Sequence, residues 1–77
     1  MVNNQDVSVT CIRHIREESG ISIKEVALDL SLNARVLQEI ETGKKGTNAK
    51  RAFRIAMYFG KPMEDLFIPM YYRAKPI

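Results

Sequence analysis

The segment from Ile23 to Thr42, which reads IKEVALDLSLNARVLQEIET, constrains the fold of this chain more than any other stretch. Its apolar residues follow helical periodicity in two short blocks, which predicts two helices joined by a break of about three residues. A small residue, Ala27, falls where the two helices must approach closely, and Leu32 lies inside the turn. The segment therefore predicts two short helices in close contact.

This arrangement is typical of a helix-turn-helix motif, here covering about residues 23–42. The second helix of such a motif lies in the major groove of DNA. We therefore expect the helix over roughly residues 34–42 to be the recognition helix.

Helix start and stop signals extend this prediction to five helices. A first helix is expected over about residues 8–19, with Gly20 after its end. Ser22 with Glu25 forms a capping box for the second helix, and Asn33 is a good N-cap for the third, after which Gly43 ends it. The fourth helix is expected from about 48 to 59, and a short fifth helix follows Pro62.

The inward faces of these helices define an expected core. Its members are Cys11, Ile12, Ile15, Val26, Ala27, Leu30, Leu37, Ile40, Ala52, Phe53, Ile55, Ala56, Phe59, Leu66 and Phe67. We expect a single all-α domain over residues 1–77, with its core in 8–68 and an apolar tail in 69–77.

Length and composition exclude several classes. A chain of 77 residues has room for one small core. It has no apolar run long enough to span a bilayer and no signal-peptide pattern, which favours a cytoplasmic location. Cys11 is the only cysteine, so neither an internal disulfide nor a thiolate metal site is expected. We expect no metal, no cofactor and no small-molecule ligand.

The net charge of +3 is unevenly distributed. Residues 43–62 carry six cations and no acid, whereas residues 23–42 have a net charge of −2. The six cations are Lys44, Lys45, Lys50, Arg51, Arg54 and Lys61. Such a cluster indicates either a polyanionic partner or a solvated helix face.

Lys50 and Arg51 fall in the first turn of the expected fourth helix. Positive side chains there oppose the helix dipole, at a cost of several tenths of a kcal/mol each. A phosphate docked at that N-terminus would offset this cost, since free N–H groups and cations both attract it. We therefore expect these two residues to contact DNA phosphates, and chance variation of a surface position is the alternative.

Four pieces of sequence, in order, now resemble the Cro/phage-repressor (XRE-type) helix-turn-helix family. They are IRHIREESGIS, EVAL, the IETGKK turn and RIAMYFGKPMEDLF, and the resemblance covers about residues 12–67. It implies a five-helix, lambda-repressor-like DNA-binding domain.

The resemblance also implies roles for individual residues. Arg16 and Glu41 match positions that form a structural ion pair between the first helix and the end of the recognition helix. Base contacts would come from Ala34, Arg35, Gln38 and Glu39. Asn33 and the Lys44–Lys45 loop match positions that commonly touch phosphates.

The residues expected to contact bases each allow other roles or only a weak contact. Arg35 is suited to guanine O6 and N7, but a phosphate contact or a solvated side chain is also open. Gln38 suits adenine or a phosphate. Glu39 can accept from cytosine N4, orient Arg35, or repel phosphates. Ala34 offers only a small apolar contact, such as to a thymine methyl.

Three positions depart from the family pattern. Ile23 replaces the polar residue that often opens the second helix, which removes one expected phosphate contact. Ser31 stands where the turn commonly has glycine, and Gly46-Thr47-Asn48 replaces a proline-containing entry to the fourth helix. The last two departures change local geometry without removing binding chemistry.

The tail is too apolar for a solvated segment. It either folds back over the core or forms a homodimer contact, for which we favour Ile68, Met70, Tyr71 and Tyr72. Operators of this family often have two half-sites, which favours a two-fold dimer. Near the N-terminus, Val7 and Val9 alternate like a short strand but also fit an extension of the first helix.

The sequence thus predicts a non-enzymatic, bacterial or phage-type regulator that binds double-stranded DNA at an inverted repeat in the nucleoid. Repression would follow from promoter occupancy, without an effector domain. The alternative is a protein-interaction module on the same fold, such as an antitoxin-like partner. No nucleophile–base arrangement, paired carboxylates or glycine-rich phosphate loop supports an enzyme.

Overall fold

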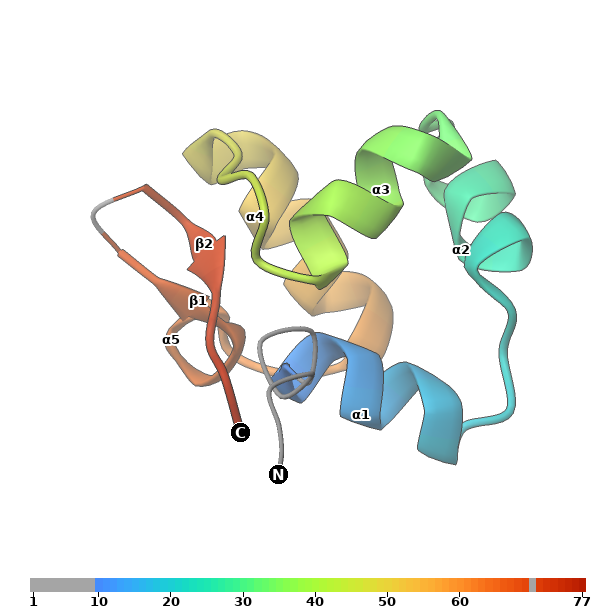
Figure 1. The fold of residues 1–77 in the computed structure, drawn as a ribbon, viewed down its shortest axis with the longest axis horizontal. Coiled ribbons are helices and arrows are strands. Elements are labelled where there is room, and N and C mark those ends of the chain that lie inside the picture. Colours follow the sequence, from blue (N-terminus) through green and yellow to red (C-terminus); the bar gives the residue numbers. More distant parts are fainter. Residues whose placement is uncertain (1–9, 70) are drawn as a thin grey trace, which may run out of the picture.

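The computed structural model describes residues 10–69 and 71–77 and contains five helices and one small hairpin within them (Figure 1). The elements are α1 (Cys11–Glu18), α2 (Ile23–Leu30), α3 (Ala34–Glu41), α4 (Ala49–Phe59), α5 (Met63–Leu66), β1 (Phe67–Ile68) and β2 (Arg73–Ala74). The prediction of an all-α domain of five helices is therefore confirmed, and the structure adds one two-stranded sheet that was not predicted.

Polar side chains cap four of the helices at their N-termini. Ser22 accepts from the Glu25 N–H, Asn33 from the Arg35 and Val36 N–H groups, and Asn48 from the Arg51 N–H. The first helix begins at Cys11, later than predicted, because Thr10 is extended and its hydroxyl accepts from the Arg13 N–H. These bonds satisfy donors that have no partner inside the helix.

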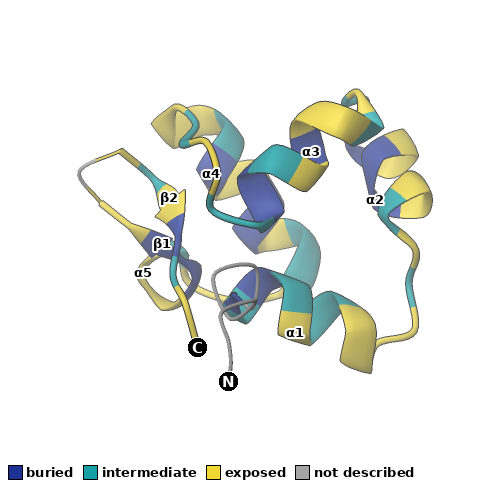
Figure 2. Ribbon diagram, viewed as in Figure 1, coloured by how far each residue is buried: buried dark blue, intermediate teal, exposed yellow. Residues whose placement is uncertain are grey.

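The core lies between the helices, each of which has a buried and an exposed side (Figure 2). Its buried apolar residues are Ile12, Val26, Ala27, Leu30, Leu37, Ile40, Ala52, Ile55, Ala56, Leu66, Phe67 and Ala74. The prediction was wrong for Phe53, whose exposed fraction is 53%, because α4 turns Ala52, Ile55 and Ala56 inward and leaves its neighbouring side in solvent. Cys11, Ile15 and Phe59 are only partly buried against this core.

The C-terminal segment folds back onto the helices as an antiparallel hairpin, with Phe67 opposite Ala74 and Ile68 opposite Arg73. Beyond β2, the Lys75 carbonyl accepts from the Cys11 N–H at 2.9 Å, and Pro76 forms an isolated bridge with Thr10. Figure 1 shows this last segment passing beside the start of α1. Of the two alternatives for the tail, folding back is therefore present. Val7, Val9 and Met70 lie outside the described residues.

In the described part of the chain, no helix is long and apolar enough to cross a membrane.

Candidate nucleic-acid interface

The third helix presents a polar face to solvent and an apolar face to the core. Leu37 and Ile40 are 1% and 2% exposed, whereas Arg35 and Gln38 are exposed. Ala34 and Glu39, which were also expected to face outward, are half-buried, and Ala34 packs against the core. The exposed side chains of α3 are therefore Arg35, Gln38 and, at 37%, Val36.

The turn between α2 and α3 is held by its backbone and by one arginine. Ser31 ends α2 in the left-handed conformation, with φ of 58° and ψ of 43°, at the position where the family commonly has glycine. The Leu32 N–H then donates to the Ala27 carbonyl at 2.8 Å. From α4, the Arg54 guanidinium donates to the Leu30 carbonyl at 2.9 Å and so occupies an acceptor left free at the end of α2.

A loop with two exposed lysines follows α3. The Lys45 N–H donates to the Glu39 carbonyl at 3.1 Å, and the Lys45 ammonium lies 3.6 Å from a Glu39 carboxylate oxygen. A hollow beside this loop is lined by Arg35, Gln38, Glu39, Thr42 and Lys44. Candidate base-reading residues and a candidate phosphate contact therefore border the same depression.

The start of α4 forms a second cationic region. Lys50 is exposed and Arg51 is half-buried, and with Asn48 and Arg54 they line a shallow hollow. Both cations follow the capped N-terminus, as expected from the sequence. From the sequence, Arg54 was predicted only as one of the six cations of residues 43–62. Its bond to the Leu30 carbonyl was missed because Arg54 and Leu30 are distant in the sequence.

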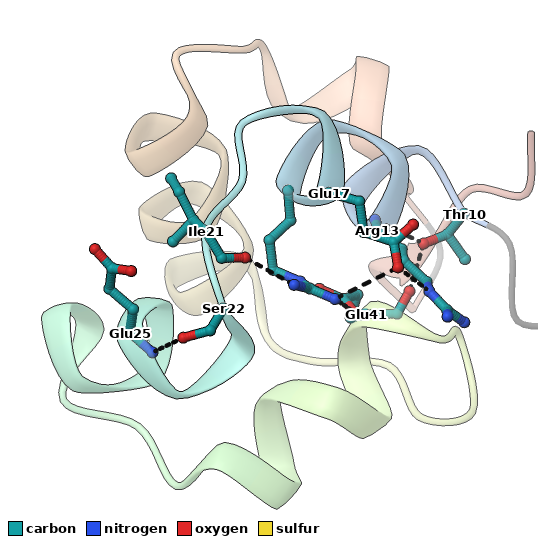
Figure 3. A network of polar contacts seen from close by, with 8 residues as sticks. Thr10, Arg13, Glu17, Ile21, Ser22, Glu25 and Glu41 are labelled. Carbon is teal, nitrogen blue, oxygen red and sulfur yellow. Dashed lines mark hydrogen bonds and ion pairs between the residues drawn. The ribbon is translucent and has the colours of Figure 1, made fainter.

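Arg16 and Glu41 join α1 to the end of α3 (Figure 3). Two guanidinium nitrogens of Arg16 donate to the two carboxylate oxygens of Glu41, and a third donates to the Ile21 carbonyl at 2.8 Å. The Glu41 side chain is only 4% exposed. This hydrogen bond to Glu41 raises the pKa of Arg16 above its ordinary value, despite partial burial.

The Thr10 hydroxyl completes this network by donating to the Glu41 carbonyl (Figure 3). The same oxygen accepts from the Arg13 N–H, so the N-cap of α1 is attached to the C-terminal end of α3. Because Glu41 is held through both its side chain and its backbone, α1 fixes the far end of the candidate recognition helix.

The remaining candidate residues belong to elements other than α3 and the loop that follows it. Ile68 and Tyr71, expected at a dimer contact, are 43% and 65% exposed, and Tyr72 is half-buried. Ile23 is half-buried at the start of α2. Within residues 10–69 and 71–77, no cluster of His, Cys, Asp and Glu side chains is arranged to hold a metal ion.

Comparison with known proteins identifies the family. The sequence pattern of a helix-turn-helix family matches residues 12–66, from α1 through α5. One similar protein is an uncharacterized HTH-type transcriptional regulator of Methanocaldococcus jannaschii, 32% identical over 57 residues, which cover 74% of this chain and 86% of the relative. The chain therefore belongs to the Cro/C1-type (XRE) family of helix-turn-helix DNA-binding domains.

Proposed function

We propose that this protein is a small transcriptional regulator that binds a specific sequence in double-stranded DNA, with α3 in the major groove. The observation that carries the proposal is the polar face of α3, where Arg35 and Gln38 are exposed beside a hollow that Lys44 also lines. The opposite face of the helix is buried, so these side chains are presented outward from a fixed support.

The proposal divides the contacts into two kinds. Asn33, Lys44, Lys45, Lys50 and Arg51 hold phosphates and position the domain. Arg35 and Gln38 read base edges, with Arg35 on a guanine and Gln38 on an adenine. Ala34 and Glu39 make smaller contacts with the bases at the edge of the α3 interface. Both are half-buried, and the Glu39 carboxylate lies beside the Lys45 ammonium. Promoter occupancy then gives repression.

Two copies bind an inverted repeat in this proposal. The dimer contact is formed by Ile68, Met70, Tyr71 and Tyr72, and the exposure of Ile68 and Tyr71 supports it. Removing the whole tail is a poor test, because Ala74 is buried and Lys75 accepts from Cys11. A Tyr71→Ser, Ile68→Ser double variant leaves those contacts in place. Light scattering should then give a monomer mass, and an unchanged dimer would remove these residues from the interface.

Selection of bound duplexes from a random DNA library at about physiological salt tests the central claim. We expect an enriched inverted repeat with half-site centres about 10 base pairs apart. Weak, salt-sensitive retention without enrichment would contradict sequence-specific binding.

Two single substitutions then separate the two kinds of contact. Arg35→Ala should lower affinity for the selected duplex by about 5- to 100-fold and relax the preference at one base pair. Lys45→Ala should weaken binding to selected and random duplexes alike. It should also reduce the slope of log affinity against log salt concentration by about 1, the value expected for the loss of one phosphate contact. Equal losses from both variants on both duplexes would contradict this division.

A protein-interaction module on the same fold is the second candidate. The observation that favours it is Leu28, a large apolar side chain on α2 that is 79% exposed. Strong duplex binding at physiological salt, unchanged by Leu28→Ser, would count against a protein partner as the main target.

A further inference from the structure

The loop between α3 and α4 is held from outside by the C-terminal hairpin. The Arg73 guanidinium donates to the carbonyls of Gly43 and Lys44 at 3.2 and 3.4 Å. At the other end of the loop, the Thr47 N–H is shared between the carbonyls of Tyr71 and Tyr72, at 3.2 and 3.3 Å. The hairpin therefore contacts both ends of a segment that carries two candidate phosphate-binding lysines.

Gly46 makes this contact unusually close. A Cβ atom at position 46 would lie 2.2 Å from the Tyr71 carbonyl oxygen and 3.2 Å from its carbonyl carbon. The φ of Gly46 is not in the left-handed region, so a side chain is excluded by the hairpin and not by the loop's own backbone. Glycine at this position allows the turn of the hairpin to rest directly on the loop.

Apart from the hairpin, the loop is bonded to the helices on either side of it, α3 and α4. Its residues belong to neither a helix nor a strand, and both lysine side chains project into solvent. Two backbone bonds tie the start of the loop to α3, from the Gly43 N–H to the Ile40 carbonyl and from the Lys45 N–H to the Glu39 carbonyl, both at 3.1 Å. A flexible loop would lose conformational entropy when its lysines and N–H groups bind phosphates, and a loop held in advance loses less.

We propose that the C-terminal hairpin positions the phosphate-binding loop 43–48, with Arg73 as the positioning residue and Gly46 as the point of close contact. This inference rests on the proposed function and adds to it a region with no place in the helix-turn-helix motif. Arg73 acts through the carbonyls of Gly43 and Lys44, and not by reading bases.

Amide hydrogen exchange tests the positioning without any DNA. In Arg73→Gln the Lys45 amide should exchange faster, and in Gly46→Ala the Thr47 amide should exchange faster, by about three- to tenfold each. The amides of Leu37 and Ile40 in α3 should keep their rates, which excludes global destabilisation. Unchanged rates at Lys45 and Thr47 in both variants would overturn the inference.

Duplex binding tests the consequence. Arg73→Gln should weaken binding to selected and random duplexes by a similar factor of about three to ten. Lys75→Gln is the matched control, since it removes the same charge two residues away on a side chain that lines a different hollow, with Cys11 and His14. It should change affinity less than twofold. Equal losses in the two variants would assign the effect of Arg73 to charge alone and overturn the inference.

A double-mutant cycle separates positioning from a direct phosphate contact. If Arg73 positions the loop, Lys45→Ala should lose less affinity in the Arg73→Gln background than in the wild type. Multiplicative effects of the two substitutions would make them independent phosphate contacts and overturn the positioning role. If the wild type binds no duplex, the proposed function fails and the consequence for DNA with it, while hydrogen exchange still decides whether the hairpin holds the loop.

Discussion

The helix-turn-helix unit over 23–42 and the hairpin over 67–74 are built by different kinds of contact. In the first, caps join residues that are neighbours in the chain, as in Ser22 with Glu25 and Asn33 with Arg35. In the second, the partners are distant, as in Arg73 with Gly43 and Tyr71 with Thr47. Local sequence thus sets where the helices of the recognition unit begin, and distant residues such as Arg54 and Arg16 add support to the unit. The hairpin is attached to loop 43–48 by distant contacts alone.

The largest expected effect would show how far the two regions depend on each other. Phe67 is 1% exposed at the start of the hairpin, so Phe67→Ala should cost about 3–5 kcal/mol of unfolding free energy through lost burial and a cavity. Urea unfolding followed by circular dichroism measures this loss. Ile77→Ala, at a site that is 69% exposed in the same C-terminal segment, is the control and should cost less than about 1 kcal/mol. Similar losses for both would mean that the hairpin is not anchored through Phe67.

A somewhat smaller effect is expected at the attachment of α1 to the helix-turn-helix unit. Arg16→Ala leaves the buried Glu41 carboxylate without its guanidinium partner and should cost about 3 kcal/mol. Arg13→Ala, which removes the exposed pair with Glu17 in the same helix, is the matched control and should cost less than about 1 kcal/mol. Equal costs, measured by urea unfolding, would show that the buried pair does not hold α3.

A gain in stability is expected within the recognition unit itself. Ser31 is in the left-handed region, where a Cβ atom is strained, so Ser31→Gly should stabilise the fold by about 0.5–1 kcal/mol. Ser19→Gly makes the same change at a helix end with φ of −80° and should bring no gain. A thermal midpoint that rises in both variants, or in neither, would contradict strain at Ser31.

The smallest effect concerns the contact between α4 and α2. The Tyr58 hydroxyl donates to an Asp29 carboxylate oxygen at 2.6 Å, which raises the pKa of Tyr58 to about 12 from 10.0. Since the folded state favours the neutral phenol, this stabilisation is complete below pH 10 and is lost as the pH rises from 10 to about 12. In an absorbance titration, Tyr58→Phe should remove the ionisation step near pH 12.

The control for this titration is Tyr71→Phe, which should leave the step near pH 12 in place. Loss of that step in the Tyr71 variant, or its persistence in Tyr58→Phe, would show that the contact with Asp29 does not control the Tyr58 phenol.

Features that depend on residues close together in the sequence were predicted correctly. Capping at Ser22 and Asn33 was predicted and found, because each cap depends on residues two or three positions away, and the structure adds a cap at Asn48, where the fourth helix was expected to start. Leu37 and Ile40 were likewise placed by helical spacing. Such features carry their information within one or two helical turns.

Features that depend on tertiary contacts were not predicted from the sequence. Phe53 is apolar, yet its exposure is set by the rotation of α4 against its neighbours. The hairpin has strands of only two residues, too short for a period-2 pattern, and its partners lie elsewhere in the fold. Arg54 and Arg73 were visible only as charges, because their carbonyl acceptors are set by tertiary packing.

The bond between the Cys11 N–H and the Lys75 carbonyl, with the adjoining bridge from Thr10 to Pro76, also bears on synthesis at the ribosome. The first turn of α1 is synthesised 64 residues before Lys75, whose carbonyl accepts from the Cys11 N–H. Contacts between such distant segments form slowly, since a long loop must close before they add stability. The helices of the recognition unit are therefore synthesised before Lys75 and Pro76, and they are available to other contacts of the nascent chain until these two residues reach α1.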